Sequence, residues 1–413
     1  MGQPPTARLL DVTRLVSRLG RGALTGVDRV ELAYLEWLLA GSVPLFGLVR
    51  TALGFLLLDG PGLHAVQRRA TGQETLGRAD LLGRLLRRDA PLRARAEADL
   101  RRLALARCSR LSLGRMLRRY LPAGTSYLNV GHANLAAPVM HAVRGVAGAR
   151  VAVLVHDTIA LDHPEYTRPG IPAVFARKLA VVACHADLVI HSTQDARART
   201  EAHLTASGRV PRGIVAALGV PVPRPEPGLL PKGLNLSRPY YVTIGTIEPR
   251  KNHALLLDVW EGLAERLPVA EVPRLFILGS RGWADAALFA RLDRAVMAGA
   301  VFELPGLPDG AVAALLAGAE ALLFPSLAEG YGLPPLEAMA MAVPVICAPL
   351  PVFHETMGNY PVYLESSVSY SWMETIMKKV VTGGQNGDPG KLARQEYAVP
   401  NWAAHFNAVL SIV

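Results

Sequence analysis

Two adjacent cations, Arg250 and Lys251, follow an apolar run and precede a helical pattern in the stretch "GTIEPRKNHALLLDVW" (245–260). Backbone N–H groups at a helix N-terminus attract anions, and two fixed cations beside it strengthen that attraction. Asn252 is placed to cap the helix. A surface loop with incidental charges is the alternative, but the pair stands at the carboxyl end of an expected strand. We therefore predict a diphosphate site that includes Gly245, Arg250 and Lys251.

Two carboxylates, Glu329 and Glu337, interrupt the otherwise apolar stretch "SLAEGYGLPPLEAMAMAVPVICA" (326–348). Buried carboxylates are costly unless something pairs with them. We expect Glu329 in a loop after a strand and Glu337 in the first turn of a helix that begins near Pro334. A carboxylate there can accept two hydroxyl hydrogen bonds, as the diol of a ribose or a hexose offers. The alternatives are a structural turn for Glu329 and a helix-dipole acid for Glu337.

The loop between these acids, Gly330, Tyr331, Gly332 and Leu333, is expected to present backbone N–H groups to the same ligand, because glycine lets the backbone approach closely.

His156 and Asp157 end another apolar run, in "VHDTIALDHPEY" (155–166). An imidazole at the edge of a ligand site can donate to a sugar hydroxyl or to a developing charge. The alternative is a satisfied core histidine. His163 and His191 are interpreted as structural.

A glycine loop enters a helix in "RLGRGALTGVDRVELAYL" (18–35), after the first expected strand. The spacing is not G-x-G-x-x-G, so no nicotinamide or flavin fingerprint is present. Gly26 could still let the chain approach a phosphate, with Arg29 nearby.

Other signatures are missing from the sequence: no two aspartates stand two residues apart, and there is no P-loop, H-E-x-x-H or G-x-S-x-G. We therefore expect no metal and no cofactor, so that Arg250, Lys251 and helix dipoles would carry the charge of a departing nucleotide diphosphate.

The elements that must position these residues alternate between short apolar strands and longer helices, which predicts parallel sheets covered on both faces. The expected strands are 150–157, 187–193, 240–246, 274–280, 321–326 and 343–348, and the expected helices are 253–267, 284–298 and 309–319. A proline-rich stretch without an apolar face separates the two sets. We predict an α/β protein with two doubly wound domains, at 1–220 and 240–385, a linker at 221–239, a closing helix region at 386–413, and a ligand cleft at the carboxyl ends of the strands.

The positive charge is concentrated in one segment. Residues 68–119 hold fifteen arginines and five acids, a net +10, which equals the formal net charge of the whole 413-residue chain. Leucine and alanine recur between the arginines at helical spacing in 80–119, which predicts a basic amphipathic helix in two pieces broken near Pro91. This segment is either a solvated helical face or a surface for anionic lipid or a lipid-phosphate acceptor. Nucleic acid is disfavoured, because no aromatic residues interleave with the arginines.

The three widely spaced cysteines fit a reduced cytoplasm, and no secretory signal or membrane-spanning apolar run is evident. We expect a cytoplasmic protein, with peripheral contact to the inner face of the plasma membrane if the basic segment binds lipid.

These motifs resemble the family 4 retaining glycosyltransferases, also called glycosyl transferases group 1, and especially bacterial mannosyltransferase-like members. The resemblance rests on "YVTIGTIEPRKNHALLLDVW" and, some eighty residues later, on "FPSLAEGYGLPPLEAMAMAVPVICA", in which Glu329 and Glu337 form the E-x7-E signature. "VHDTIALDHPEY", "ADLVIHSTQDAR" and "TGVDRVELAYL" resemble the acceptor domain of the same family. The likeness fails in about 40–120.

The resemblance implies a GT-B fold, in which two Rossmann-like domains face each other, and a nucleotide-diphosphate sugar donor. GDP-mannose is favoured, and a UDP-sugar is the alternative. Arg250 and Lys251 would bind the diphosphate, Glu337 the ribose, and Glu329 with the amides from Gly330 to Leu333 the donor sugar and distal phosphate. His156 would lie by the reacting face of the sugar, and Gly26 would approach the diphosphate.

The leading hypothesis is a retaining glycosyltransferase that moves a hexose, mannose favoured, to a lipid-linked or cell-surface polysaccharide acceptor. Two other classes stay open: a nucleotide-sugar 2-epimerase with a related fold, and a non-catalytic nucleotide-sugar-binding protein. An epimerase would release a free sugar product without any acceptor.

Overall fold

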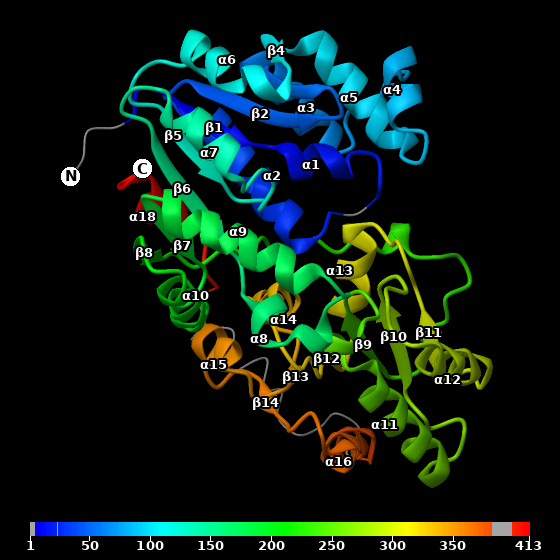
Figure 1. Cartoon of the computed structure of the whole chain (residues 1–413). Coiled ribbons are helices and arrows are strands. Elements are labelled where there is room, and N and C mark those ends of the chain that lie inside the picture. The colour runs from blue at the N-terminus through cyan, green and yellow to red at the C-terminus, as the bar shows by residue number, and fades with distance from the viewer. Residues whose placement is uncertain (1–4, 23, 223, 382–398) are drawn as a thin grey trace. The chain divides into compact units, whose positions relative to one another are not determined.

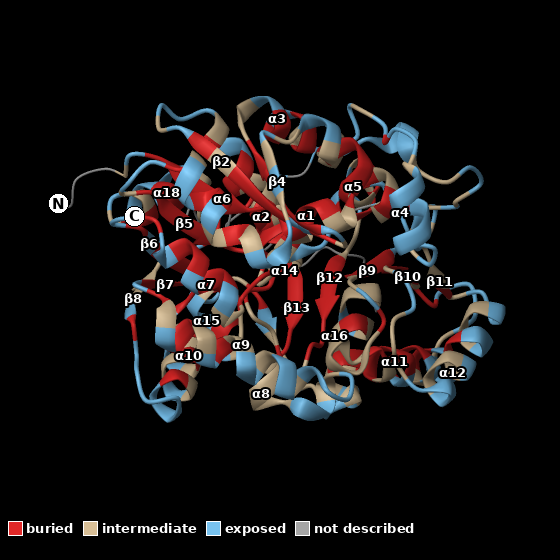
Figure 2. Cartoon of the chain, turned by 45° about the horizontal axis from the view of Figure 1, so that its top comes forward, coloured by how far each residue is buried: buried red, intermediate tan, exposed pale blue. Residues whose placement is uncertain are grey.

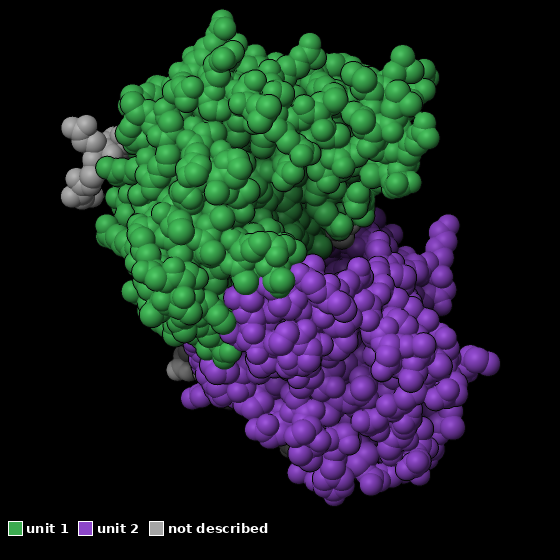
Figure 3. Space-filling view, viewed as in Figure 1, with its two compact units in different colours: residues 1–158, 173–218, 402–413 green, residues 159–172, 219–401 purple. Residues whose placement is uncertain are grey.

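The chain folds into two units, each built around its own sheet, in a computed structural model that describes residues 5–22, 24–222, 224–381 and 399–413 (Figure 1). Contacts within the chain assign residues 1–158, 173–218 and 402–413 to unit 1 and residues 159–172 and 219–401 to unit 2 (Figure 3).

Unit 1 contains an eight-stranded sheet in the order β4-β3-β2-β1-β5-β6-β7-β8. Its strands are β1 (Arg8–Asp11), β2 (Leu45–Thr51), β3 (Gly54–Leu58), β4 (Ala106–Cys108), β5 (Ser126–Asn129), β6 (Arg150–Val155), β7 (Leu188–His191) and β8 (Arg212–Val215). Pairing is parallel from β2 through β8, whereas β3 and β4 run antiparallel at one edge. β5 and β7 are buried along their whole length, as expected for strands covered on both faces.

The helices of this part of the chain cover the sheet, and their outer faces are exposed (Figure 2). They are α1 (Thr13–Arg18), α2 (Gly26–Leu39), α3 (Gly60–Ala70), α4 (Leu81–Leu86), α5 (Pro91–Leu103), α6 (Leu113–Tyr120), α7 (Ala137–Arg144), α9 (Ile171–His185), α10 (Gln194–Ala206) and α18 (Trp402–Leu410). The C-terminal helix α18 packs against α2. There the Tyr34 hydroxyl lies 2.8 Å from His405 Nε2, and the rings of Trp37 and Phe406 stack with centroids 4.7 Å apart.

Unit 2 contains a six-stranded, wholly parallel sheet in the order β11-β10-β9-β12-β13-β14. Its strands are β9 (Tyr240–Ile244), β10 (Arg274–Leu278), β11 (Val301–Glu303), β12 (Ala321–Phe324), β13 (Val345–Cys347) and β14 (Val362–Tyr363). Counted from its own first strand, this order is 3-2-1-4-5-6, the order of doubly wound dinucleotide-binding folds. The order reverses between β9 and β12, and such a point is where these folds bind ligands.

The helices of unit 2 are α8 (Ile159–Asp162), α11 (His253–Arg266), α12 (Ala286–Met297), α13 (Asp309–Ala317), α14 (Leu333–Ala340), α15 (Pro351–Met357) and α16 (Ser369–Val381). Trp260 of α11 and Trp372 of α16 lie in the core, and each buried indole N–H donates to a backbone carbonyl, Pro273 O at 2.8 Å and Glu365 O at 3.0 Å. The buried polar atoms of these large side chains are therefore satisfied.

The predicted fold class is confirmed, and the six expected strands correspond to β6, β7, β9, β10, β12 and β13. The expected helices correspond to α11, α12 and α13. The predicted division at residue 220 lies next to the unit boundary after Leu218, but contacts assign 159–172 to unit 2 and the helix at 402–410 to unit 1. The proline-rich stretch 221–239 also belongs to unit 2, where the Glu226 N–H donates to Gly310 O at 2.9 Å. Residues 386–398 of the expected closing region lie outside the described residues.

The basic segment is helical on both sides of Pro91, as predicted, and α5 begins at that proline. The prediction of helix up to residue 119 is wrong after α5. The chain there forms β4, which pairs with β3 and is the edge strand of the sheet, and a separate helix α6 follows. Among the described helices, none combines the length and the apolar character that a membrane crossing requires.

Candidate functional site

Two loops of unit 2 meet at the point where the strand order reverses. One follows β9 and the other follows β12, and these parallel strands are neighbours in the sheet, so their carboxyl ends lie at the same edge. The Leu327 N–H donates to Arg250 O at 2.8 Å and joins the two loops directly. The structure thereby brings together the two motifs that the sequence places about eighty residues apart.

The first loop contains a short 3₁₀ turn, Pro249–Lys251, which carries both predicted cations to the start of α11. The predicted cap is wrong in its chemistry: Asn252 is the N-cap residue, but its side chain caps nothing and donates instead to Ser366 O at 3.0 Å. Asn252 adopts a left-handed conformation with φ of 53°, which asparagine tolerates better than most residues. That conformation turns its amide away from the helix.

Glu329, from the second loop, pairs with both cations. Its Oε2 lies 2.7 Å from Arg250 Nη1, and its Oε1 bonds to Lys251 Nζ. The carboxylate side chain is only 8% exposed. The predicted role of Glu329 as a hydroxyl-binding group is untested, and in this state the carboxylate binds the predicted diphosphate-binding cations themselves.

Two further residues, Glu248 and Phe324, contact these cations, and the sequence analysis named neither. Glu248 Oε1 accepts from Arg250 Nη2 at 2.9 Å, so that Arg250 lies between two carboxylates. Lys251 Nζ lies 4.4 Å from the centre of the Phe324 ring, at the end of β12. The only sequence signal for Glu248 is its place in "EPRK". We define the cation cluster as Glu248, Arg250, Lys251 and Glu329.

The charges of the cation cluster stabilise one another. Burial raises the pKa of the Glu329 carboxyl, but Arg250 and Lys251 outweigh burial and hold that pKa at about 2. Burial lowers the pKa of the Lys251 ammonium, and Glu329 partly offsets this effect. The cluster thus holds two positive and two negative charges in a site that largely excludes water.

Two of the predicted glycines have a steric reason to be glycine. Gly245 has φ of +145°, and a Cβ there would lie 3.1 Å from the Lys251 side chain. Gly332 has φ of +83° at the N-cap of α14, and a Cβ would lie 2.5 Å from Phe353 Cε1. Glycine at these positions lets each loop pass close to its neighbours.

The remaining predicted residues of this unit lie along the second loop and α14. Gly330 and Leu333 are partly exposed, Tyr331 is buried, and Leu333 begins the helix. The predicted position of Glu337 in the first turn is wrong, because α14 begins at Leu333 and its first turn contains no acid. Glu337 is the fifth residue of α14, just past the first turn, and is 6% exposed, so the helix-dipole explanation for it is weaker than predicted.

In unit 1, His156 and His132 cross-link the ends of two adjacent strands. His156 Nε2 lies 2.7 Å from Val130 O and His132 Nε2 lies 2.8 Å from Leu154 O, with the rings 5.1 Å apart. A carbonyl only accepts, so each Nε2 carries the hydrogen. His132 is a further residue that the sequence analysis did not name, although "GHAN" after β5 contains it.

This geometry corrects the donor role predicted for His156. Burial lowers the pKa of the His156 imidazole to about 4, so the ring is neutral at pH 7. Its single N–H is engaged by Val130, and Nδ1 is then an acceptor. His156 can therefore receive a hydrogen bond from a hydroxyl group but cannot donate a second one.

Gly26 is the first residue of α2 and is exposed. The loop before it is held by Asp28, a buried carboxylate that accepts from the Thr25 N–H at 3.0 Å and from Arg14 Nε at 2.8 Å. Arg29, predicted to lie near Gly26, is partly buried in the first turn of the same helix. The structure thus shows a fixed helix start at Gly26 and leaves its phosphate contact a prediction.

Among the residues that the structure describes, no group of three or more His, Cys, Asp or Glu side chains is arranged to hold a metal ion.

A doubly wound unit with buried cations at its strand-order reversal is typical of a nucleotide-binding domain. A chain of two such α/β units, each with its own largely parallel sheet, is typical of the GT-B fold. Residues 231–366 match the family described as glycosyl transferases group 1, as the motifs predict, so this segment is similar to the glycosyltransferase domain of that family. The match includes the whole cation cluster.

Known proteins agree with this assignment. The chain is 28% identical to the serotype-specific mannosyltransferase WbdA of Escherichia coli over 257 residues. This aligned segment is 59% of this chain and 31% of that protein. It is 38% identical to the O-antigen chain mannosyltransferase B of Escherichia coli over 29% of this chain and 31% of that protein. The chain thus spans about a third of the length of these relatives. The crystal structure of Anabaena Alr3699/HepE in complex with UDP and glucose matches 98% of this chain and 99% of that one, with a TM-score of 0.64 at 14% identity, which shows the shared fold.

Proposed function

We propose that this chain is a hexosyltransferase that transfers mannose from GDP-mannose to a lipid-linked or cell-surface polysaccharide acceptor, on the cytoplasmic side of the membrane. The observation that carries the proposal is the cation cluster at the reversal between β9 and β12, inside the segment that matches the glycosyltransferase family. The choice of mannose is supported by the two mannosyltransferases to which the chain is similar.

The departing nucleotide diphosphate is the charge that the cation cluster must stabilise. Arg250 offers a planar fork of donors, and Lys251 offers a point charge in a site where burial strengthens electrostatic interactions. Both cations are engaged by Glu329, so the diphosphate competes with this carboxylate or shares its partners. We propose that Glu329 then turns to the hydroxyl groups of the sugar, with Glu337 at the ribose and the amides from Gly330 to Leu333 near the phosphate.

The proposed transfer retains the configuration of the sugar and uses Arg250 and Lys251 in place of a metal ion. The bond between the sugar's anomeric carbon and the β-phosphate oxygen breaks, and the acceptor oxygen bonds to that carbon from the same face. The acceptor's hydroxyl proton passes to the departing phosphate oxygen. Neutral His156 accepts a hydrogen bond from a sugar hydroxyl and holds the ring in place.

Nucleotide binding provides the first test. Thermal-shift measurements with GDP, UDP, ADP and their sugars should show stabilisation, largest with GDP-mannose. Arg250→Ala should remove most of the shift. Arg291→Ala is the matched control, because Arg291 also binds two carboxylates, Asp258 and Glu261, but on the surface of α12. No shift with any nucleotide would refute the donor site.

Product analysis provides the second test. With a mannose-terminated acceptor and GDP-mannose, NMR of the product should show the anomeric configuration of the donor. Inversion would refute the proposed mechanism, and a 2-epimerised free sugar formed without acceptor would replace the proposed function.

A further inference from the structure

Helix α4 presents four leucines to solvent. Leu81, Leu82, Leu85 and Leu86 are 77%, 54%, 60% and 50% exposed. The only buried residue of the helix is Gly83, so α4 packs against α5 through a glycine and turns its large apolar side chains outward. Figure 2 shows α4 as an exposed element at the periphery. A contiguous exposed apolar patch on a soluble domain marks an interaction site more often than an accident of packing.

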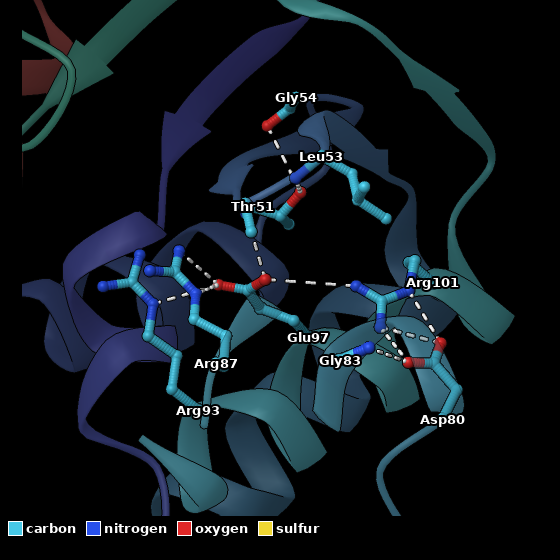
Figure 4. A network of polar contacts seen from close by, with 10 residues as sticks. Thr51, Leu53, Gly54, Asp80, Gly83, Arg87, Arg93, Glu97 and Arg101 are labelled. Carbon is cyan, nitrogen blue, oxygen red and sulfur yellow. Dashed lines mark hydrogen bonds and ion pairs between the residues drawn. The ribbon is translucent and has the colours of Figure 1, made fainter. Parts of the chain in front are cut away.

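Polar contacts at both ends hold α4 in this orientation (Figure 4). Asp80 caps the helix by accepting from the Gly83 N–H at 2.7 Å, and Arg101 of α5 binds the same carboxylate at 2.7 Å. At the other end, Arg87 donates to Glu97 of α5 at 3.0 Å. Because both ends of α4 are held, its four leucines face solvent while the helix is intact, and not because the helix frays.

Most acids of the basic segment form ion pairs with arginines of the same segment. Glu97 is 1% exposed and binds Arg87 and Arg93, while Asp99 and Glu74 bind other arginines of the segment. Only Asp89 is an exposed acid for which the described residues show no ion pair.

Eight arginines of the segment, in contrast, are exposed and have no acidic partner among the described residues. They are Arg78, Arg84, Arg88, Arg107, Arg110, Arg115, Arg118 and Arg119. Three of them, Arg78, Arg84 and Arg88, lie on or next to α4. The surface around the four leucines is thus positively charged, although the segment contains five acids.

We propose that α4 is a membrane-docking element: its leucines enter the boundary between headgroups and acyl chains of an anionic bilayer, and Arg78, Arg84 and Arg88 bind lipid phosphates. Apolar side chains flanked by arginines match that interface, where each basic residue near the surface strengthens binding about fivefold. A nucleic acid would leave four leucines in water and would find no aromatic side chain between residues 78 and 90. A second copy of the chain would bring like charges together. This proposal does not depend on the proposed function, because lipid binding requires no donor or acceptor.

Vesicle flotation of the full chain tests the proposal. Wild type should float with vesicles of phosphatidylcholine and phosphatidylglycerol and stay unbound with phosphatidylcholine alone. Arg84→Glu with Arg88→Glu should weaken binding by about twentyfold or more, and rising salt should weaken wild-type binding. Leu81→Ser with Leu85→Ser should weaken it by about tenfold or more.

The matched control is Arg294→Glu with Met297→Ser, which alters one exposed arginine and one exposed apolar residue on α12 of unit 2. It should float like wild type. Circular dichroism and the GDP-induced thermal shift should be unchanged in every variant, because all substituted side chains are exposed. A loss of lipid binding is thereby separated from a failure of the donor site.

Three results would overturn the proposal. One is equal binding to neutral and anionic vesicles, or no binding at all. Another is an equal effect of the α4 variants and the α12 control. The third is light scattering that shows a wild-type oligomer which Leu81→Ser with Leu85→Ser converts to a monomer while flotation is unchanged, because α4 would then be a contact between copies.

Discussion

Glu329 and Lys251 stand 78 residues apart in the sequence and form an ion pair at the carboxyl edge of the second sheet. Because Glu329 also binds Arg250, one carboxylate contacts both cations of the predicted diphosphate site. The anion site is therefore already occupied by an acid of the chain itself. In the proposed function, a diphosphate competes with this acid for the two cations or shares them, so that Glu329 would affect both the strength of nucleotide binding and the position of the sugar.

This exchange predicts opposite effects on binding and on turnover for Glu329→Gln. The amide removes one of the two negative charges of the cation cluster and leaves Glu248 as the remaining one. The site then has a net positive charge, so the affinity for GDP should rise by about threefold to tenfold. Transfer should fall by about a hundredfold, because the carboxylate no longer orients the sugar. Titration calorimetry with GDP and a transfer assay measure the two effects. Equal losses in both would mean that Glu329 only holds the loops together.

The depressed pKa of Glu329 predicts a specific loss of stability in acid. The folded carboxyl titrates at about 2, below its ordinary value of 4.5, so its contribution is fully present above pH 4.5 and is lost as the pH falls toward 2. Across that window, the contribution amounts to about 3 kcal/mol. Glu329→Gln should show a shallower decline of the unfolding free energy between pH 4.5 and 2 than wild type in urea titrations. Parallel curves for the two proteins would contradict the depressed pKa.

Glu97 is predicted to be a structural residue of the basic segment. Its buried carboxylate accepts from Arg87, from Arg93 and from the Ala52 N–H at 3.1 Å, and so connects α4, α5 and the turn after β2. Glu97→Ala should lower the unfolding free energy by about 3 kcal/mol, because it leaves these groups without their common partner. Urea denaturation measures the change. Glu74→Ala is the control, since that carboxylate is half-exposed and should cost under about 1 kcal/mol. Similar costs for the two variants would count against the network.

The sequence alone was sufficient for β6, β7, β9, β10, β12 and β13 and for α11, α12 and α13, because each of these strands is a short, nearly continuous apolar run. It gave no ranges for the other described strands, among them the antiparallel β3 and β4. It also located Arg250, Lys251 and Glu329, since charged residues stand out after apolar strands. The pairing of these residues could not be read, because it depends on β9 and β12 becoming neighbours, which only the strand order determines. Glu337 lies one residue further into its helix than predicted, because α14 begins at Leu333 and not at Pro334.

Other predictions failed because of contacts that the sequence does not show. Asn252 has the residue type of a helix cap, yet its left-handed backbone directs the amide to Ser366. The predicted donor role of His156 is wrong because its N–H already donates to Val130 O, in the loop after a neighbouring strand. The sequence does not show which carbonyl a histidine N–H will reach. In the basic segment, counting arginines gave the net charge but could not show that Glu97 and Asp99 are buried and bind several of them. These outcomes rest on contacts between residues far apart in the chain.

Gly332 provides a test in which steric clash is separated from backbone strain. Its φ is +83°, and a Cβ would approach Phe353 Cε1 to 2.5 Å, whereas Gly299 has φ of +81° and nothing within 4 Å of its Cβ. Gly299→Ala should therefore cost only the strain of the left-handed backbone, about 1 kcal/mol. Gly332→Ala should cost about 2 kcal/mol more, because the added methyl group overpacks the contact between α14 and α15.

Gly332→Ala should also reduce the GDP-induced thermal shift, since the loop that carries Glu329 ends at Gly332. Adding Phe353→Leu should restore part of both losses, because the smaller side chain makes room for the methyl group. Equal costs for the two alanine variants in urea denaturation would show that the Phe353 contact relaxes easily and that the loop does not need glycine for packing.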